Sequence, residues 1–125
     1  MNFEVAMPIL GFEDIRELEL VKIDDNFATL NAKNGVSWSL VNPYSLRPYQ
    51  FSLSIKEQIL LDVRKDSHLE VYCMMILQKP LEDSKVNFLS PLVFNFSNKR
   101  VLQFHCQGLD YPQYLKLESL RYFIS

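Results

Sequence analysis

Glycine is scarce in this sequence, which has three glycines in 125 residues. Phosphate-binding loops need glycines at fixed spacing, because only glycine lets the backbone approach a phosphate closely. No GxGxxG, GxxxxGK[ST] or GxSxG pattern is present. The sequence patterns of the common nucleotide-binding loops and of the hydrolase nucleophile elbow are therefore missing.

Cysteine and histidine are also scarce, with two of each. Cys73 and Cys106 form no CxxC pair, and neither His68 nor His105 has a cysteine or an acid at ligand spacing. We therefore expect no zinc site, no cofactor and no catalytic residue. The cysteines suit small buried thiols in a reduced protein, although a disulfide stays open. His105 is expected on the outer face of a strand.

Basic clusters and long apolar runs are missing too. The net charge is −2, and the only adjacent cations are Arg64-Lys65 and Lys99-Arg100. Affinity for nucleic acid grows with the number of phosphates neutralised, so direct binding to nucleic acid is disfavoured. No apolar run approaches bilayer length, and the N-terminus meets Glu4 at once instead of starting with cations. We expect a soluble cytoplasmic protein with no membrane contact.

What the sequence does have is apolar residues in two-residue alternation. Apolar side chains make up 48% of the chain, enough for one core, and residues 1–125 are expected to form a single domain. The clearest alternation occupies residues 86–106. A three-residue loop at 98–100 would pair Phe94 with Phe104 and leave Asn95 on a mostly polar outer face.

A second hairpin is expected around Asn34-Gly35. A two-residue loop, which this dipeptide usually indicates, would scatter the apolar residues over both faces. A three-residue loop at 33–35, with Gly35 in the left-handed conformation, pairs Leu30 with Trp38 instead. Further strands are expected over residues 2–7, 16–23 and 68–78.

One helix is predicted, over residues 55–64. Ser54 is a good N-cap, and Glu57 three residues later completes a capping box. The expected apolar stripe consists of Ile55, Ile59 and Val63, with Leu60 beside it. A short C-terminal helix is allowed by Leu117, Leu120, Arg121 and Ile124. The fold class is mainly β, a small antiparallel barrel or sandwich.

Two groups of residues are candidates for binding a partner. Glu13, Asp14 and Glu17 begin a run of acids that can present an acidic face to a basic partner. The alternative is an ordinary solvated face, partly compensated by nearby cations. Tyr44 and Tyr49 lie in a proline-containing segment, and they suit either an interface or the packing of a crossover loop.

Three short blocks, in this order, resemble the flagellar assembly factor FliW family: residues 8–14 (PILGFED), 42–44 (NPY, with Pro48 after it) and 87–95 (NFLSPLVFN). The likeness covers residues 3–103. Each block is short, but the set in one order is fairly specific. Ser90 stands where the family more often has alanine, and the tail after Gly108 matches no pattern of the family.

The resemblance implies a non-enzymatic, barrel-like protein that switches between partners. FliW proteins bind flagellin and, when flagellin is exported, bind the RNA-binding regulator CsrA and relieve its action on flagellin mRNA. Basic CsrA is expected at Glu13, Asp14 and Glu17, and flagellin near Tyr44 and Tyr49.

The resemblance also includes three residues that we expect to be structural. Phe12 should insert into the core. Pro91 should interrupt the strand pairing where two pieces of strand meet. Asn95 is also expected to have a structural role.

Two other classes of protein stay open. A closed barrel can hold a small molecule, which would need small residues around a cavity. The expected inward side chains are large: Phe94, Phe96, Leu102, Phe104, Trp38 and Leu40. A hydrolase whose site is assembled from distant residues is the third class.

Overall fold

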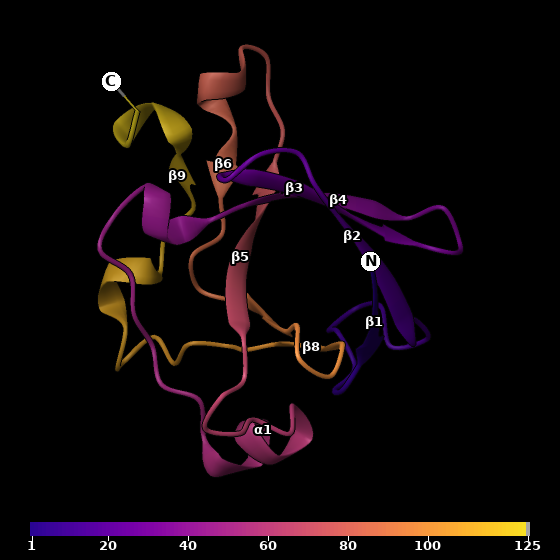
Figure 1. Cartoon of the computed structure of the whole chain (residues 1–125). Helices are drawn as coiled ribbons and strands as arrows, with labels where there is room; N and C mark the ends of the chain where they lie inside the picture. The colour runs from indigo at the N-terminus through magenta and orange to yellow at the C-terminus, as the bar shows by residue number, and fades with distance from the viewer. Residues whose placement is uncertain (125) are drawn as a thin grey trace.

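A closed β-barrel forms the centre of the molecule (Figure 1). The computed structural model describes residues 1–124, and over these residues one sheet follows the order β4-β3-β2-β1-β8-β7-β5-β6-β9. A further pairing of β4 with β5 closes seven of the strands into a ring. The strands are β1 (Asn2–Val5), β2 (Glu17–Lys22), β3 (Phe27–Ala32), β4 (Ser37–Val41), β5 (Leu69–Ile76), β6 (Lys85–Val86), β7 (Leu92–Asn95), β8 (Arg100–Gln103) and β9 (Glu118–Ser119). The prediction of a mainly β barrel is confirmed.

The β3–β4 hairpin has the predicted register. Leu30 lies opposite Trp38, and the amide of Ala32 donates to the carbonyl of Val36 at 2.8 Å. Gly35 has a φ of 92°, the left-handed conformation that the three-residue loop requires. The alternation of apolar residues therefore predicted the register correctly, although Asn-Gly usually indicates a two-residue loop.

The β7–β8 hairpin has a different register from the predicted one. Phe94 pairs with Val101 and Asn95 with Arg100, around a four-residue loop at 96–99. The predicted three-residue loop and its polar outer face are wrong, because both faces of these strands are buried. All residues of β7 and β8 except the half-buried Arg100 are buried, whichever face they are on.

The outer face of β7 and β8 is covered by α1 (Ile55–Leu60) and the residues after it. Leu61 is fully buried there and packs with Val93 and Leu102. The capping box of Ser54 and Glu57 is present as predicted.

The predicted extent of the helix is wrong, and its apolar stripe is right only in part, because Leu60 and Val63 pack against the buried cluster of Leu61, Val93 and Leu102 whereas Ile55 and Ile59 do not. The helix ends at Leu60, and Asp62 has a φ of 51°, which no α-helix continues. Ile55 and Ile59 are 75% and 69% exposed, because a one-turn-and-a-half helix docks through its C-terminal end and not along one face.

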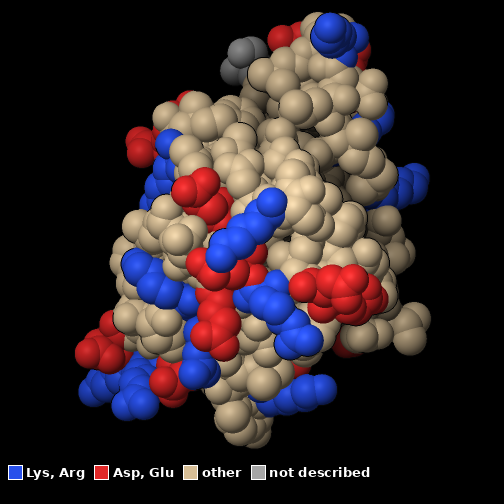
Figure 2. All heavy atoms as spheres, turned by 90° about the vertical axis from the view of Figure 1, so that its right-hand side faces the viewer, with Lys and Arg blue, Asp and Glu red and all other residues tan. Residues whose placement is uncertain are grey.

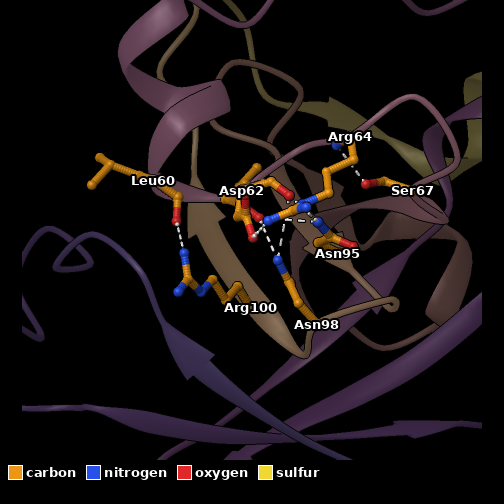
Figure 3. Close-up of polar contacts among 8 residues, drawn as sticks. Leu60, Asp62, Arg64, Ser67, Asn95, Asn98 and Arg100 are labelled. Atoms are coloured by element: carbon orange, nitrogen blue, oxygen red, sulfur yellow. Dashed lines mark hydrogen bonds and ion pairs between the residues drawn. The ribbon is translucent and has the colours of Figure 1, made fainter.

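Three side chains of the β7–β8 hairpin hold the end of α1 (Figure 3). Asn95 and Asn98 both donate from Nδ2 to the carbonyl of Leu61, at 3.0 and 2.8 Å. Arg100 donates to the carbonyl of Leu60 at 3.0 Å. The last carbonyls of a helix have no partners within it, so these donors stabilise the point where the chain leaves the helix. Asn95, predicted on a polar outer face, is a buried structural residue.

The tail beyond Gly108 packs against the outside of the barrel. It contains η3 (Pro112–Tyr114), β9 and η4 (Leu120–Tyr122), so the allowed C-terminal α-helix is replaced by a single 3₁₀ turn. The other 3₁₀ turns are η1 (Pro43–Ser45) and η2 (Leu81–Asp83). Among residues 1–124, no helix has the length and apolar character that crossing a membrane requires.

Large side chains fill the barrel interior. Its buried cluster includes Phe3, Leu18, Leu20, Leu30, Leu40, Tyr72, Leu92, Phe94 and Val101. Of the six predicted inward residues, Leu40 and Phe94 belong to this cluster, and Trp38 and Phe96 pack against it. Leu102 and Phe104 instead pack outside the barrel. A filled interior does not favour the small-molecule-binding alternative.

Candidate partner-binding surface

The loop between β1 and β2 is tightly anchored at both ends. Ile9 and Ile15 are buried, and the amide of Phe12 donates to the carbonyl of Ile9 at 2.8 Å. Gly11, with a φ of 85°, allows the turn between them. The anchors leave Leu10 74% exposed at the tip of the loop. This loop is therefore an anchored segment that leaves its remaining side chains exposed.

Phe12 lies on the surface of this loop and is not inserted into the core as predicted. Its side chain is 37% exposed and makes an edge-to-face contact with Trp38, with ring centroids 5.0 Å apart. Ile9, the bridge partner of Phe12 across the turn, is buried instead, at 2% exposed. The loop thus adds Phe12 and Leu10 as apolar residues beside the acids.

The predicted acidic residues share this surface with cations. Glu13 accepts a hydrogen bond from the amide of Gly11 at 3.1 Å, which stiffens the turn. Asp14 and Glu17 line one shallow depression together with Arg16 and Lys33. The ammonium of Lys33 lies 3.6 Å from the carboxylate of Glu17, and both side chains are well exposed.

The charged surface as a whole is mixed. Figure 2 shows acidic and basic side chains next to one another on the side of the molecule that it views. Around Asp14 and Glu17, too, acids and cations are interspersed, since Arg16 and Lys33 line the same depression.

The two candidate tyrosines have different environments. Tyr44 is 53% exposed, whereas Tyr49 is 5% exposed and donates from its hydroxyl to the carbonyl of Phe88 at 2.6 Å. Burial raises the pKa of Tyr49, with smaller contributions from nearby Cys73 and Cys106. The rings of Tyr44 and Tyr49 meet edge to face at 5.7 Å. Tyr49 is therefore part of the core that supports Tyr44, and only Tyr44 of the pair is available to a partner.

Tyr44 borders a groove that sequence reasoning did not find. The groove has a volume of about 490 Å³ and separates the 42–53 segment from the first half of β5. Apolar side chains dominate its lining, among them Tyr44, Phe51, Leu53, Leu69 and Val71. The proline of the Asn42-Pro43-Tyr44 block was a usable sign, because it ends β4 while β5 continues.

The two cysteines are free and buried. Burial raises the pKa of Cys73 to about 12 and that of Cys106 to about 11. Thiols become nucleophiles and metal ligands when ionised, so burial disfavours the reactive form of both cysteines.

The histidines lie apart from the cysteines. His68 contacts the Glu70 carboxylate at 2.7 Å, and His105 contacts the hydroxyl of Ser90 at 3.0 Å. His105 is exposed, as predicted, but lies just beyond β8. In the part of the chain that the structure describes, no group of three or more His, Cys, Asp or Glu side chains is placed to hold a metal ion.

Comparison with known proteins places the chain in one family. The model of the FliW family, described as FliW protein, matches residues 1–117. A protein of Helicobacter pylori (strain G27) named Flagellar assembly factor FliW is 44% identical, with 99% of this chain and 95% of the relative covered. Flagellar assembly factor FliW 1 of Wolinella succinogenes is 37% identical, with 99% and 98% covered.

A solved structure shares the fold. The crystal structure of the flagellar assembly factor FliW superposes with a TM-score of 0.84 over 95% of this chain and 84% of the other, at 20% identity. That likeness shows that the fold is shared, whereas the family model and the sequence relatives show which family the chain belongs to. The resemblance indicated by the three short blocks is confirmed, and the chain belongs to the FliW family.

Proposed function

We propose that this protein is a cytoplasmic flagellar assembly factor that acts by binding other proteins and catalyses no reaction. The observation that carries the proposal is the full-length similarity to relatives named flagellar assembly factor FliW. The filled barrel interior supports it, because residues 1–124 leave the outer surface as the place where recognition can occur.

The partners that we propose are flagellin and CsrA, in competition. While flagellin is abundant, it occupies the protein. When flagellin is exported, the freed protein binds CsrA and relieves its action on flagellin mRNA. Such a switch needs no chemistry on this chain, because mass action between the two partners sets the concentration of each complex.

Two surfaces are proposed for these partners. CsrA, as a basic partner, is assigned to Glu13, Asp14 and Glu17, where Leu10 and Phe12 add apolar contact area. Flagellin is assigned to the surface around Tyr44. Tyr49, which we expected to contact flagellin, is assigned a supporting role because it is buried.

Co-purification tests the proposal. The tagged full chain should retain flagellin and CsrA from cell lysate at low salt, and purified flagellin added in excess should release CsrA. High salt should weaken the CsrA complex more, because its proposed contacts are charged. Recovery of neither partner at either salt concentration would contradict the proposed function and leave the family assignment in place.

A further inference from the structure

The first half of β5 has an open side. β4 pairs with β5 through Val41, which lies opposite Cys73, and then the chain turns away. Asn42 caps this turn by accepting a hydrogen bond from the amide of Tyr44 at 3.0 Å, and Pro43 begins η1. The 42–53 segment then runs beside the lower half of β5 in Figure 1 without pairing with it.

The hydrogen bonds on the opposite side of β5 show which of its backbone groups face this open side. The amide of Phe96 donates to the carbonyl of His68 at 2.8 Å, so His68 faces the β7–β8 hairpin. In an antiparallel ladder alternate residues face the same neighbour, so Glu70 faces β7 as well, whereas Leu69 and Val71 face away from it.

These outward backbone groups are unpaired. Within residues 1–124, no hydrogen bond satisfies the N–H and C=O groups that Leu69 and Val71 direct to the open side. A row of unpaired N–H and C=O groups on a strand edge is a template for another extended chain. The edge is three residues long, from 69 to 71, and it borders the groove beside Tyr44.

The side chains of the groove match such an occupant. Leu69 and Val71 point to the same face of the sheet, and Phe51 and Val71 both pack against the buried cluster of Leu61, Val93 and Leu102 and line the groove. A chain paired with this edge would direct alternate side chains onto that apolar face, next to Tyr44 and Leu53. The peptide side chain between these two would point to the opposite face of the sheet, the face on which Glu70 lies.

We propose that this groove binds an extended peptide segment of a protein partner, added as a strand to β5 and apolar at alternate positions. This mode of recognition takes affinity from main-chain hydrogen bonds and specificity from pockets for alternate side chains. The inference deepens the proposed function, since the peptide would belong to one of its partners, but its test needs neither flagellin nor CsrA.

A second copy of this chain is a poorer occupant. Antiparallel pairing of two copies centred on the open residues would place the two Glu70 side chains directly opposite each other. Like charges at that position destabilise a strand pair. The carboxylate of Glu70 is already fixed by Lys22 at 2.7 Å and by His68, so it does not turn away freely.

The experiment uses a phage-displayed library of linear 12-residue peptides, selected on the immobilised full chain. Recovered peptides, remade in synthetic form, should share apolar residues at alternate positions. Methylation of their backbone amides should weaken binding with a period of two, by about tenfold at each sensitive position, since each one loses a main-chain hydrogen bond.

Two variants of the protein link the binding to the groove. Leu69→Pro removes one outward N–H at the first residue of β5 and keeps the β5–β7 ladder, a position where strands accept proline. Tyr44→Asp places a charge at the groove, and it remains informative if Leu69→Pro does not fold. Each should weaken peptide binding about tenfold or more, whereas Leu77→Asp, at a side chain that is 55% exposed like the 53% of Tyr44 but lies outside the groove, should not.

Different results would contradict this inference and the proposed function. Selection of no binder, or peptides that bind Leu69→Pro and Tyr44→Asp as tightly as the unchanged protein, would overturn the inference. If sedimentation shows that the unchanged protein is a dimer and that Leu69→Pro dissociates it, the occupant of the groove would be a second copy of the chain and not a peptide. Failure of flagellin and CsrA to bind would contradict the proposed function and would not alter any of these results.

Discussion

Asn95 illustrates at the scale of one residue how a polar side chain can organise a core. It is fully buried in β7, donates from Nδ2 to the carbonyl of Leu61, and accepts at Oδ1 from the amide of Ser97 at 3.0 Å. We predict that Asn95→Ala lowers the free energy of unfolding by about 2 kcal/mol, because it leaves buried polar groups without partners.

The measurement for Asn95 is urea unfolding followed by circular dichroism. The matched control is Asn26→Ala at an exposed turn, where the side chain makes no hydrogen bond within residues 1–124 and a change below about 0.5 kcal/mol is expected. Equal effects of the two substitutions would show that the contacts of Asn95 with α1 contribute little.

The cysteines give a second prediction at this scale. Because burial raises the pKa of Cys73 to about 12 and that of Cys106 to about 11, almost no thiolate is present at pH 8. Iodoacetamide at pH 8 should label neither thiol in the native protein and should label both in 8 M urea. Fast labelling of one native thiol, located by mass spectrometry, would show that its part of the core opens readily.

At the scale of one element, α1 depends on its capping box. The hydroxyl and the backbone amide of Ser54 donate to the carboxylate of Glu57, and the amide of Glu57 donates back to Ser54 Oγ at 3.3 Å. We predict that Ser54→Ala costs about 1 kcal/mol of stability at pH 7. Ser52→Ala, an exposed serine outside the cap, serves as the control.

The stabilisation from the cap should depend on pH. The side-chain hydrogen bond from Ser54 lowers the pKa of Glu57 below its ordinary value of 4.5. A carboxyl group whose pKa is lowered by folding stabilises the protein above its ordinary pKa, and this contribution is lost as the pH falls through the lowered value. The difference between the unchanged protein and Ser54→Ala should therefore narrow from pH 7 to pH 3 in urea unfolding. A difference that stays constant would mean that only the Ser54 hydroxyl matters.

The two hairpins show what elements can be predicted from sequence. The β3–β4 hairpin was predictable because one face alternates clearly, so a wrong register would expose Leu30 or Trp38. The β7–β8 hairpin was not predictable by the same rule, because α1 buries its second face and alternation no longer distinguishes inside from outside. The apparent polarity of Asn95 misled the prediction, since its partner is the helix end and not water.

At the scale of the whole molecule, the candidate surface, like the hairpins, was predictable only in part from the sequence. Glu13, Asp14 and Glu17 are all exposed, and Asp14 and Glu17 line one depression, as their closeness in sequence allows. Tyr44 and Tyr49 look alike in sequence, and only the packing of Phe88 and the C-terminal tail separates a surface ring from a buried one. Pro43 marks in the sequence where β4 ends, but the groove also depends on β5, a strand far along the chain whose position beside β4 no local pattern encodes.

The electrostatics of the whole molecule give the last prediction. The net charge is close to zero and the charges are mixed, so we expect a basic partner to be attracted by a local group of acids, and the proposed group is Glu13 and Asp14. Changing both to lysine should slow association with CsrA at low salt, leave folding intact, and lose its effect as salt screens the charges. Stopped-flow or surface plasmon resonance at two salt concentrations measures this rate.

The control for that experiment separates local from total charge. Asp66→Lys with Asp110→Lys changes the net charge by the same amount at two exposed acids outside the loop. If net charge alone steered the partner, both double variants would slow association equally. A slower rate only when Glu13 and Asp14 are reversed would locate the encounter at the β1–β2 loop, whereas unchanged rates in both would remove CsrA from this surface, because steering requires that charges near the contact dominate the field.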